Sequence, residues 1–147
     1  MKLLITILAL FTIVAVYTDA NASTDVTIEM LNKDDKGNKM IYSDELVDIQ
    51  VGDTITWVPT SKGHNVEFKT VPEGVDKIKK SKVNKEYSYT FEVPGVYVYW
   101  CTPHKSMGMI GIVIVGDDIS NIEKAYKTKV VGKSKKKLKA LLDSYGQ

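Results

Sequence analysis

Residues that carry reactive chemistry are scarce in this chain of 147 residues: it has one cysteine, two histidines and no arginine. A single cysteine cannot form a disulfide within the chain, so a free thiol needs another explanation, either pairing with a second molecule or binding a metal. Arginine makes the bidentate contacts that nucleic-acid phosphates and bases favour, so its absence gives nucleic-acid binding little support. The 20 lysines are nearly balanced by 18 acidic residues.

The first 22 residues are predicted to be a signal peptide. Lys2 gives a short positive region, and Leu3–Tyr17 is a run of apolar or hydroxyl-bearing residues. Ala20-Asn21-Ala22 then places small residues at the two positions that a signal peptidase recognises. The run is shorter than a bilayer span, and no stop-transfer charge cluster follows at once, so an uncleaved anchor is the less favoured alternative. We expect export, cleavage after about Ala22, and one mature domain over residues 23–147.

Short strands dominate the pattern from about residue 23 to residue 116. β-branched and aromatic runs are separated by turns rich in Gly, Pro and Asp, which is typical of an antiparallel sandwich or barrel. The Lys-rich stretch 69–85, broken by Pro72 and Gly74, is interpreted as a surface loop. The predicted strands are Val26–Leu31, Leu46–Val51, Thr54–Val58, Tyr87–Val93, Val96–Trp100 and Ile110–Val115.

Two short helices are predicted between about residues 120 and 146. Ser120-Asn121-Ile122-Glu123 is a capping-box sequence that opens a helix through about Lys127, and Gly132 separates it from a second segment. The lysines of 133–139 would form the solvated side of a helix docked on the sandwich; a membrane-surface helix is the less favoured alternative. In the second segment four apolar side chains at helical spacing share one face, namely Leu138, Leu141, Leu142 and Tyr145.

The segment from Cys101 to Met109 gathers a thiol, an imidazole and two thioethers between two predicted strands. The second histidine, His64, follows the predicted strand Thr54–Val58 after a short loop. One Cys, two His and a Met are the ligand set of a blue-copper site, with three strong ligands and a weak axial thioether. This set suits both Cu(I) and Cu(II), so the ligands rearrange little when the copper ion gains an electron. The sequence therefore predicts a copper redox site.

Two methionines compete for the axial position. Met107 would give a His-x2-Met spacing from His104, and Met109 would give His-x4-Met. We favour Met109, because it adjoins the returning strand and Gly108 permits a tight approach. Met107 would then project outward beside His104 as an apolar surface contact.

The same residues resemble the pseudoazurins, a family of small periplasmic cupredoxins. The matching stretches include Cys101–His104 with Met107-Gly108-Met109, Pro94–Tyr97, Lys62–Glu67 and Met30–Lys33. The resemblance covers nearly the whole mature chain, including the two helices. It implies an all-β Greek-key sandwich, cupredoxin-like, with two short C-terminal α-helices and one type 1 copper ion.

The resemblance also implies residue roles. The copper ligands would be His64, Cys101, His104 and the axial Met109. Residues around these ligands would include Asn65, which hydrogen-bonds the cysteine sulfur, together with Met40 and Pro103. Partner proteins would dock on Met107, Lys62 and Lys105. Trp100 departs from the family pattern, since many members have a lysine or a similar residue there, and strand alternation points it away from the metal.

These expectations describe a periplasmic one-electron carrier that serves a reductase, such as copper nitrite reductase or a haem peroxidase, or a c-type cytochrome. No enzyme is expected: copper enzymes need further histidines, and His104 lies too near Cys101 for a cysteine protease. Stable membrane insertion is not expected either. The alternatives are a cupredoxin of another chain, plastocyanin-like or amicyanin-like, and a copper delivery or storage protein.

Overall fold

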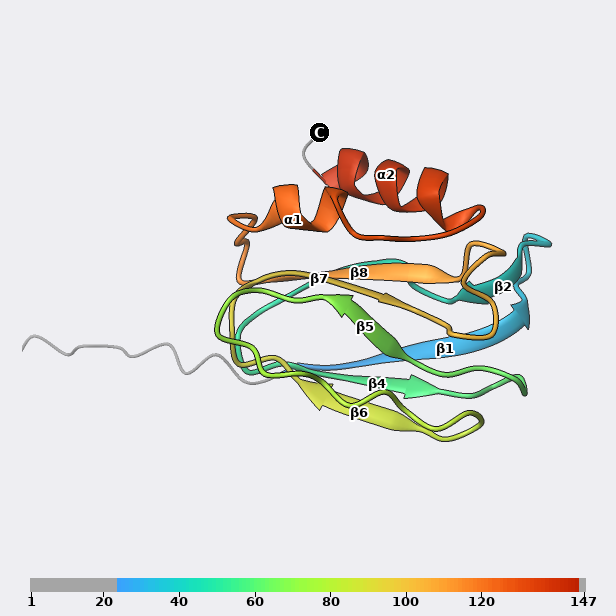
Figure 1. The fold of residues 1–147 in the computed structure, drawn as a ribbon. Coiled ribbons are helices and arrows are strands. Elements are labelled where there is room, and N and C mark those ends of the chain that lie inside the picture. The colour runs from blue at the N-terminus through green and yellow to red at the C-terminus, as the bar shows by residue number, and fades with distance from the viewer. Residues whose placement is uncertain (1–23, 146–147) are drawn as a thin grey trace, which may run out of the picture.

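The computed structural model describes residues 24–145, which form two packed four-stranded sheets with two helices lying on one of them (Figure 1). The strands are β1 (Asp25–Lys33), β2 (Lys39–Tyr42), β3 (Leu46–Ile49), β4 (Thr54–Val58), β5 (Glu67–Thr70), β6 (Tyr87–Thr90), β7 (Gly95–Trp100) and β8 (Ile110–Val115). The helices are α1 (Ile122–Tyr126) and α2 (Ser134–Tyr145). The predicted signal peptide, residues 1–22, lies outside the described residues.

Each sheet combines parallel and antiparallel pairs. The strand orders are β2-β1-β4-β6 and β3-β8-β7-β5, with β1 parallel to β4 and β3 parallel to β8. The predicted sandwich with two C-terminal helices is confirmed, but the purely antiparallel pairing is wrong. Parallel neighbours need long crossover connections, which local alternation in the sequence does not report.

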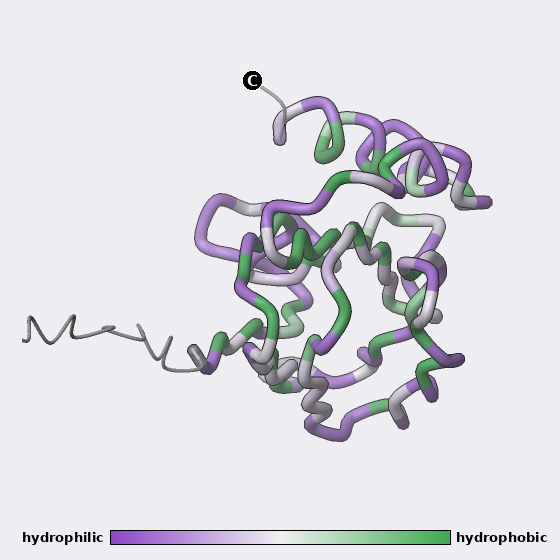
Figure 2. The backbone as a smooth tube through the Cα atoms, turned by 90° about the vertical axis from the view of Figure 1, so that its left-hand side faces the viewer, coloured by the Kyte–Doolittle hydropathy of each residue, from purple (hydrophilic) through white to green (hydrophobic). Residues whose placement is uncertain are grey.

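Strands β7 and β8 are buried on both faces. One face meets the aromatic core between the sheets, where the Trp57 ring lies 5.2 Å from that of Tyr99. The other face packs against the helices through Ala125, Leu138 and Leu142. This double burial explains why both strands read as continuous apolar runs. It also confirms that α2 docks on the sandwich. Figure 2 shows the two helices lying over the sheet, and many of the helical residues are hydrophilic.

Several boundaries differ from the sequence prediction. Strand β2 was not predicted, and β5 occupies the start of the segment interpreted as a loop, whereas residues 71–86 contain no helix or strand. Strand β6 ends at Thr90, three residues before the predicted end at Val93, although the Phe91 N–H still donates to the Asp53 carbonyl at 2.9 Å. Within residues 24–145, neither helix is long and apolar enough to cross a membrane.

The capping box predicted at the start of α1 is not formed. Asn121 is the N-cap residue, but its side chain makes no capping bond to the helix. Instead its amide oxygen accepts from the Val96 N–H at 2.8 Å, and its amide nitrogen donates to the Val96 carbonyl at 2.9 Å. Asn121 therefore satisfies two backbone groups of β7 and joins α1 to the sheet.

Replacing Asn121 by alanine should lower the free energy of unfolding by about 1–3 kcal/mol, because the Val96 N–H and carbonyl would lose their partners. Urea denaturation of the purified domain measures this change. Gln50→Ala, at an exposed position, is the control and should change stability by less than about 0.5 kcal/mol. Equal effects of the two substitutions would contradict the bridging role.

Candidate metal centre

Cys101 and His104 lie in the tight loop that joins β7 to β8. The Cys101 N–H donates to the Met109 carbonyl at 3.0 Å, and the His104 N–H donates to the Cys101 carbonyl at 3.1 Å. The Met109 N–H in turn donates to the His104 carbonyl at 3.4 Å. These bonds close the loop on itself, so the spacing of two residues between Cys101 and His104 brings their side chains together.

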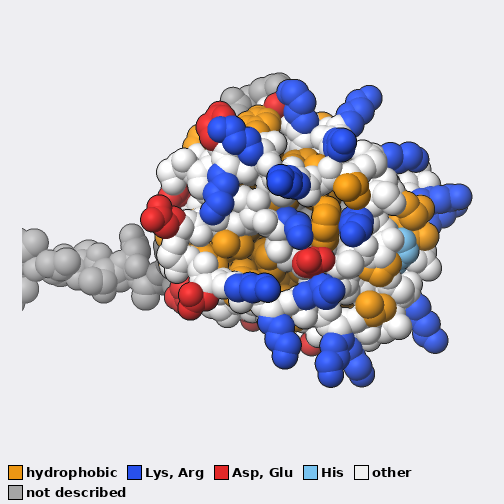
Figure 3. Space-filling model, in the orientation of Figure 1, with side chains coloured by type: hydrophobic (Ala, Val, Ile, Leu, Met, Phe, Trp, Pro, Cys, Tyr) orange, Lys and Arg blue, Asp and Glu red, His pale blue; other side chains and the backbone are white. Residues whose placement is uncertain are grey.

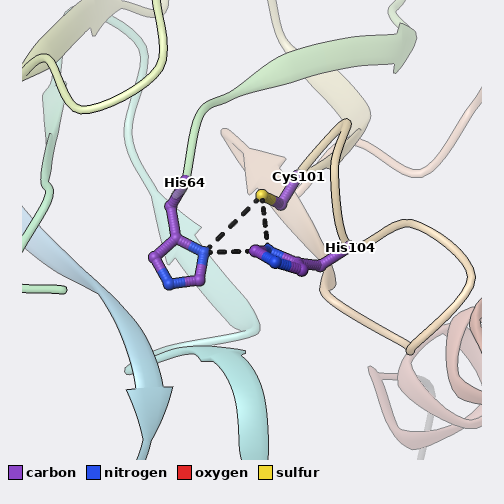
Figure 4. Close-up of side chains that lie close together, drawn as sticks. All are labelled: His64, Cys101 and His104. Carbon is purple, nitrogen blue, oxygen red and sulfur yellow. Dashed lines mark hydrogen bonds between the residues drawn. The ribbon is translucent and has the colours of Figure 1, made fainter. Parts of the chain in front are cut away.

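His64 reaches the same place from the segment between β4 and β5 (Figure 4). The preceding Gly63 has a φ of +96°, a conformation that favours glycine, and its N–H donates to the Asn84 side-chain oxygen at 2.6 Å. A Cβ atom at Gly63 would lie 3.7 Å from the His104 ring. The glycine thus permits the left-handed backbone conformation that precedes His64, whose side chain is fully buried.

Three donor atoms form a compact triangle. Cys101 Sγ lies 3.7 Å from His64 Nδ1 and 3.4 Å from His104 Nδ1, and the two nitrogens are 3.1 Å apart. A point equidistant from the three atoms lies about 2.0 Å from each, close to the roughly 2.0–2.3 Å bonds that imidazole and thiolate make to a metal such as zinc. Within residues 24–145, no other close group of His, Cys and acidic side chains of this kind is found. The donor set therefore fits a copper ion.

Asn32 of β1 fixes the tautomer of His64. Its side-chain oxygen lies 2.9 Å from His64 Nε2. Because an amide oxygen only accepts, the ring proton resides on Nε2, and the Nδ1 lone pair faces Cys101. Sequence reasoning gave Asn32 no role: the residue belongs to a stretch that resembles the pseudoazurins, but its contact with His64 spans 32 positions in the chain.

The site keeps both imidazoles neutral. Burial lowers the pKa of His64 to about 4, with a further contribution from repulsion by His104. Burial also lowers the pKa of His104. In contrast, burial raises the pKa of the Cys101 thiol, although backbone N–H groups of Asn65 and His104 act against this. The histidines can therefore bind a metal at neutral pH without losing a proton, whereas the cysteine must release one.

Asn65 ties the two ligand-bearing segments together. Its side-chain oxygen accepts from the Thr102 N–H at 2.8 Å, while its amide nitrogen donates to Thr102 Oγ1 at 3.2 Å and to the Ser81 carbonyl at 3.3 Å. The resemblance to the pseudoazurins implies a hydrogen bond from Asn65 to the cysteine sulfur, and in the structure the Asn65 backbone N–H acts against the rise in the pKa of the Cys101 thiol. Asn65, the residue after His64, thus holds Thr102, the residue after Cys101.

The two methionines of the loop lie in different surroundings. Met109 is fully buried in the core cluster that also contains Cys101, whereas Met107 is 45% exposed. Met40 is partly buried against the same cluster, and Pro103 lies exposed on the loop. This distribution favours Met109 as the axial donor and Met107 as a surface contact.

The lysines predicted to meet partners differ in their surroundings. Lys62 is exposed beside the His64 segment. Lys105 is partly buried, and its Nζ lies 5.2 Å from the centre of the Trp100 ring. Trp100 itself packs with the residues beneath the helices, so it points away from the donor atoms as strand alternation predicts. Figure 3 shows hydrophobic side chains around a histidine at one end of the molecule, with lysines nearby.

The start of α2 supports the outer side of the ligand loop, the segment between β7 and β8 that carries Cys101 and His104. The Lys133 N–H donates to the Ser106 carbonyl at 2.9 Å, and the Ser134 hydroxyl donates to the Lys105 carbonyl at 2.5 Å. Gly132 has a φ of +58°, and a Cβ atom there would clash with the Ser106 carbonyl oxygen. Sequence reasoning recognised Gly132 only as a separator of two helices, so this support of the loop was missed.

Known proteins are similar to this chain in sequence. The family described as copper binding proteins of the plastocyanin/azurin family matches residues 28–116. A putative pseudoazurin from Rhizobium leguminosarum bv. viciae is 42% identical over 80% of this chain and 78% of its own length. The pseudoazurin of Paracoccus pantotrophus is also 42% identical, over 78% of this chain and 79% of its own.

Solved structures agree with this result. The crystal structure of pseudoazurin from Methylobacterium extorquens AM1 matches with a TM-score of 0.76 and 36% identity, covering 83% of this chain and 99% of that one. A plastocyanin from Prochlorothrix hollandica matches only 51% of this chain. The Greek-key cupredoxin fold and the copper cofactor are therefore confirmed. The chain belongs to the pseudoazurins, electron-carrying copper proteins of the plastocyanin/azurin family that are not enzymes.

Proposed function

We propose that this protein is a periplasmic one-electron carrier whose copper ion is held by His64, Cys101 and His104, with Met109 as the weak axial ligand. The triangle of donor atoms, with sides of 3.1, 3.4 and 3.7 Å, carries the proposal. The predicted signal peptide, residues 1–22, supports export to the periplasm.

The bound copper would supply a one-electron cycle between Cu(II) and Cu(I). Cys101 would provide a thiolate once its thiol proton is released, and neutral His64 and His104 would provide lone pairs. Asn32 and Asn65 would hold the donors in place through their hydrogen bonds. Because the donors are already close together, little rearrangement would accompany electron transfer.

A partner would approach at the partly exposed edge of His104. Pro103 and the exposed Met107 belong to the same loop and would offer an apolar contact there. Lys62 and Lys105, with the exposed Lys33, Lys36 and Lys39, would steer an acidic partner and speed its encounter. We propose a reductase as the partner, such as copper nitrite reductase or a haem peroxidase, or a c-type cytochrome.

Copper delivery or storage fits the structure less well. Proteins that hand over a metal expose their ligands to an acceptor, whereas His64 and Cys101 are fully buried. A retained ion that changes oxidation state suits such a site better than an ion that is exchanged.

Adding Cu(II) to the purified mature protein should produce an intense thiolate-to-copper absorption band and a narrow copper hyperfine splitting in electron paramagnetic resonance. Cys101→Ser should abolish both, because the thiolate donates the electron density that produces them. Visible absorption and electron paramagnetic resonance spectra measure the effect, and Ser106→Ala in the same loop is the control. A colourless wild-type protein would exclude an electron carrier of this kind.

Met109→Leu should change the visible and electron paramagnetic resonance spectra more than Met107→Leu does. The buried Met109 side chain would lose its sulfur from the copper environment, whereas Met107 is 45% exposed. Both substitutions replace a thioether by an apolar side chain of similar volume, so packing changes little. The opposite order of effects would assign the axial position to Met107.

Copper affinity should fall roughly tenfold for each unit of pH between about pH 8 and pH 6.5, because binding releases the thiol proton of Cys101. The slope should steepen only below pH 6.5, since the pKa values of both histidines are lowered, and His64 should add its own proton only near pH 4. Competition with a chelator across this range measures the slope. Steepening already above pH 6.5 would show that an imidazole is protonated in the metal-free site.

A further inference from the structure

Glu67 of β5 contacts both neighbours of Cys101. Its Oε2 atom accepts a hydrogen bond from Trp100 Nε1 at 2.8 Å and another from Thr102 Oγ1 at 2.7 Å. Trp100 precedes the cysteine and Thr102 follows it, so one carboxylate oxygen joins the two sides of Cys101. Glu67 and Trp100 also lie opposite each other in the β5–β7 register.

The Glu67 carboxylate is charged and only partly exposed. Burial acts to raise its pKa, but hydrogen bonds from Trp100 and Thr102 and the nearby Lys69 outweigh burial and lower the pKa. Lys69 Nζ lies 3.4 Å from Glu67 Oε1 and 4.6 Å from the centre of the Trp100 ring. Lys69 therefore balances the charge of the carboxylate.

The contact with Thr102 continues toward the sulfur. Thr102 Oγ1 donates to Glu67, and the same oxygen accepts from the Asn65 side chain at 3.2 Å. The side-chain oxygen of Asn65 also accepts from the Thr102 N–H at 2.8 Å. These hydrogen bonds thus connect Glu67 through Thr102, the residue after Cys101, to Asn65, the residue after His64.

We propose that Glu67 is a positioning residue for the copper thiolate, acting through Trp100 and Thr102 to fix the orientation of the Cys101 side chain. The inference rests on the proposed copper site and extends it to a residue that does not touch the metal. Groups beyond the ligands commonly set ligand orientation and the electronic properties of a metal centre. The acceptor oxygen, rather than the negative charge, is the feature that positions the cysteine.

Two substitutions separate these features. Glu67→Ala removes both the charge and the acceptor, whereas Glu67→Gln removes the charge and keeps a carbonyl oxygen that can accept from Trp100 and Thr102. Trp100→Phe removes the Nε1 donor and keeps a smaller aromatic ring. Glu73→Ala, at an exposed position, removes a carboxylate elsewhere and is the control.

The first measurement needs no metal. Hydrogen exchange of the Thr102 backbone amide, followed by nuclear magnetic resonance in the copper-free protein, should be on the order of tenfold faster in Glu67→Ala, which corresponds to about 1.4 kcal/mol. Glu67→Gln and Glu73→Ala should stay within about threefold of wild type. Circular dichroism of each variant verifies that the sandwich has folded.

The second measurement uses the copper-loaded protein. Glu67→Ala should shift the thiolate-to-copper band and the hyperfine splitting and should release copper to a chelator on the order of tenfold faster. Glu67→Gln should match wild type, and Trp100→Phe should give a smaller shift of the same sign. In the Glu67→Ala background, Trp100→Phe should add no further shift, because the shared acceptor is already gone.

Wild-type exchange and spectra in Glu67→Ala would overturn the proposal, as would equal shifts in Glu67→Ala and Glu67→Gln, which would assign the effect to charge. If Glu67→Ala does not fold, Trp100→Phe decides, and its wild-type spectra would likewise overturn the proposal. Failure of the proposed function is distinct: the wild-type protein itself would then remain colourless with copper.

Discussion

The hydrogen bonds between the His64 segment and the Cys101 loop determine whether the three donor atoms can act as one site. The donors come from positions 37 and 40 residues apart, and Asn65 and Thr102 join their segments at 2.8 Å. Ordering such a site from a flexible chain would cost conformational entropy at the moment of metal binding. Here that ordering accompanies folding, so the metal meets donors that are already close together.

The sheets supply the rigidity that this arrangement needs. Cys101 directly follows β7, and Met109 directly precedes β8, two strands with every residue buried. A close-packed surrounding resists displacement of the loop between them. The helices contribute by covering the outer face of these strands, and Asn121 attaches α1 to the edge of β7. The positions of the proposed copper ligands therefore depend on the packing of the whole domain.

The sequence was most informative where a local pattern or a rare residue type carried the information. The bounds of β4 and β8 match the predicted strands, because alternation or double burial left a clear signature. Scarcity of cysteine and histidine identified the candidate donors, which the structure brings together. Strand β2 was missed, since its residues Lys39–Tyr42 show no alternation of polar and apolar side chains.

The contacts that orient the donors could not be predicted in the same way. Asn32, Glu67 and Ser134 act on the site across 32, 35 and 29 positions of sequence, respectively. Each is a common polar residue with an ordinary local context, so no spacing rule distinguishes it from a solvated side chain. Only the three-dimensional path of the chain shows which polar side chains meet the donors.

The attachment of α2 to the ligand loop has a consequence for protein engineering. Lys133 and Ser134 bond successive carbonyl groups of that loop, and Gly132 leaves no space for a side chain against it. A loop of different length grafted from another cupredoxin would present its carbonyls elsewhere. Transplanting the metal-binding segment into this scaffold therefore requires the helix entrance at residues 132–134 to be redesigned together with it.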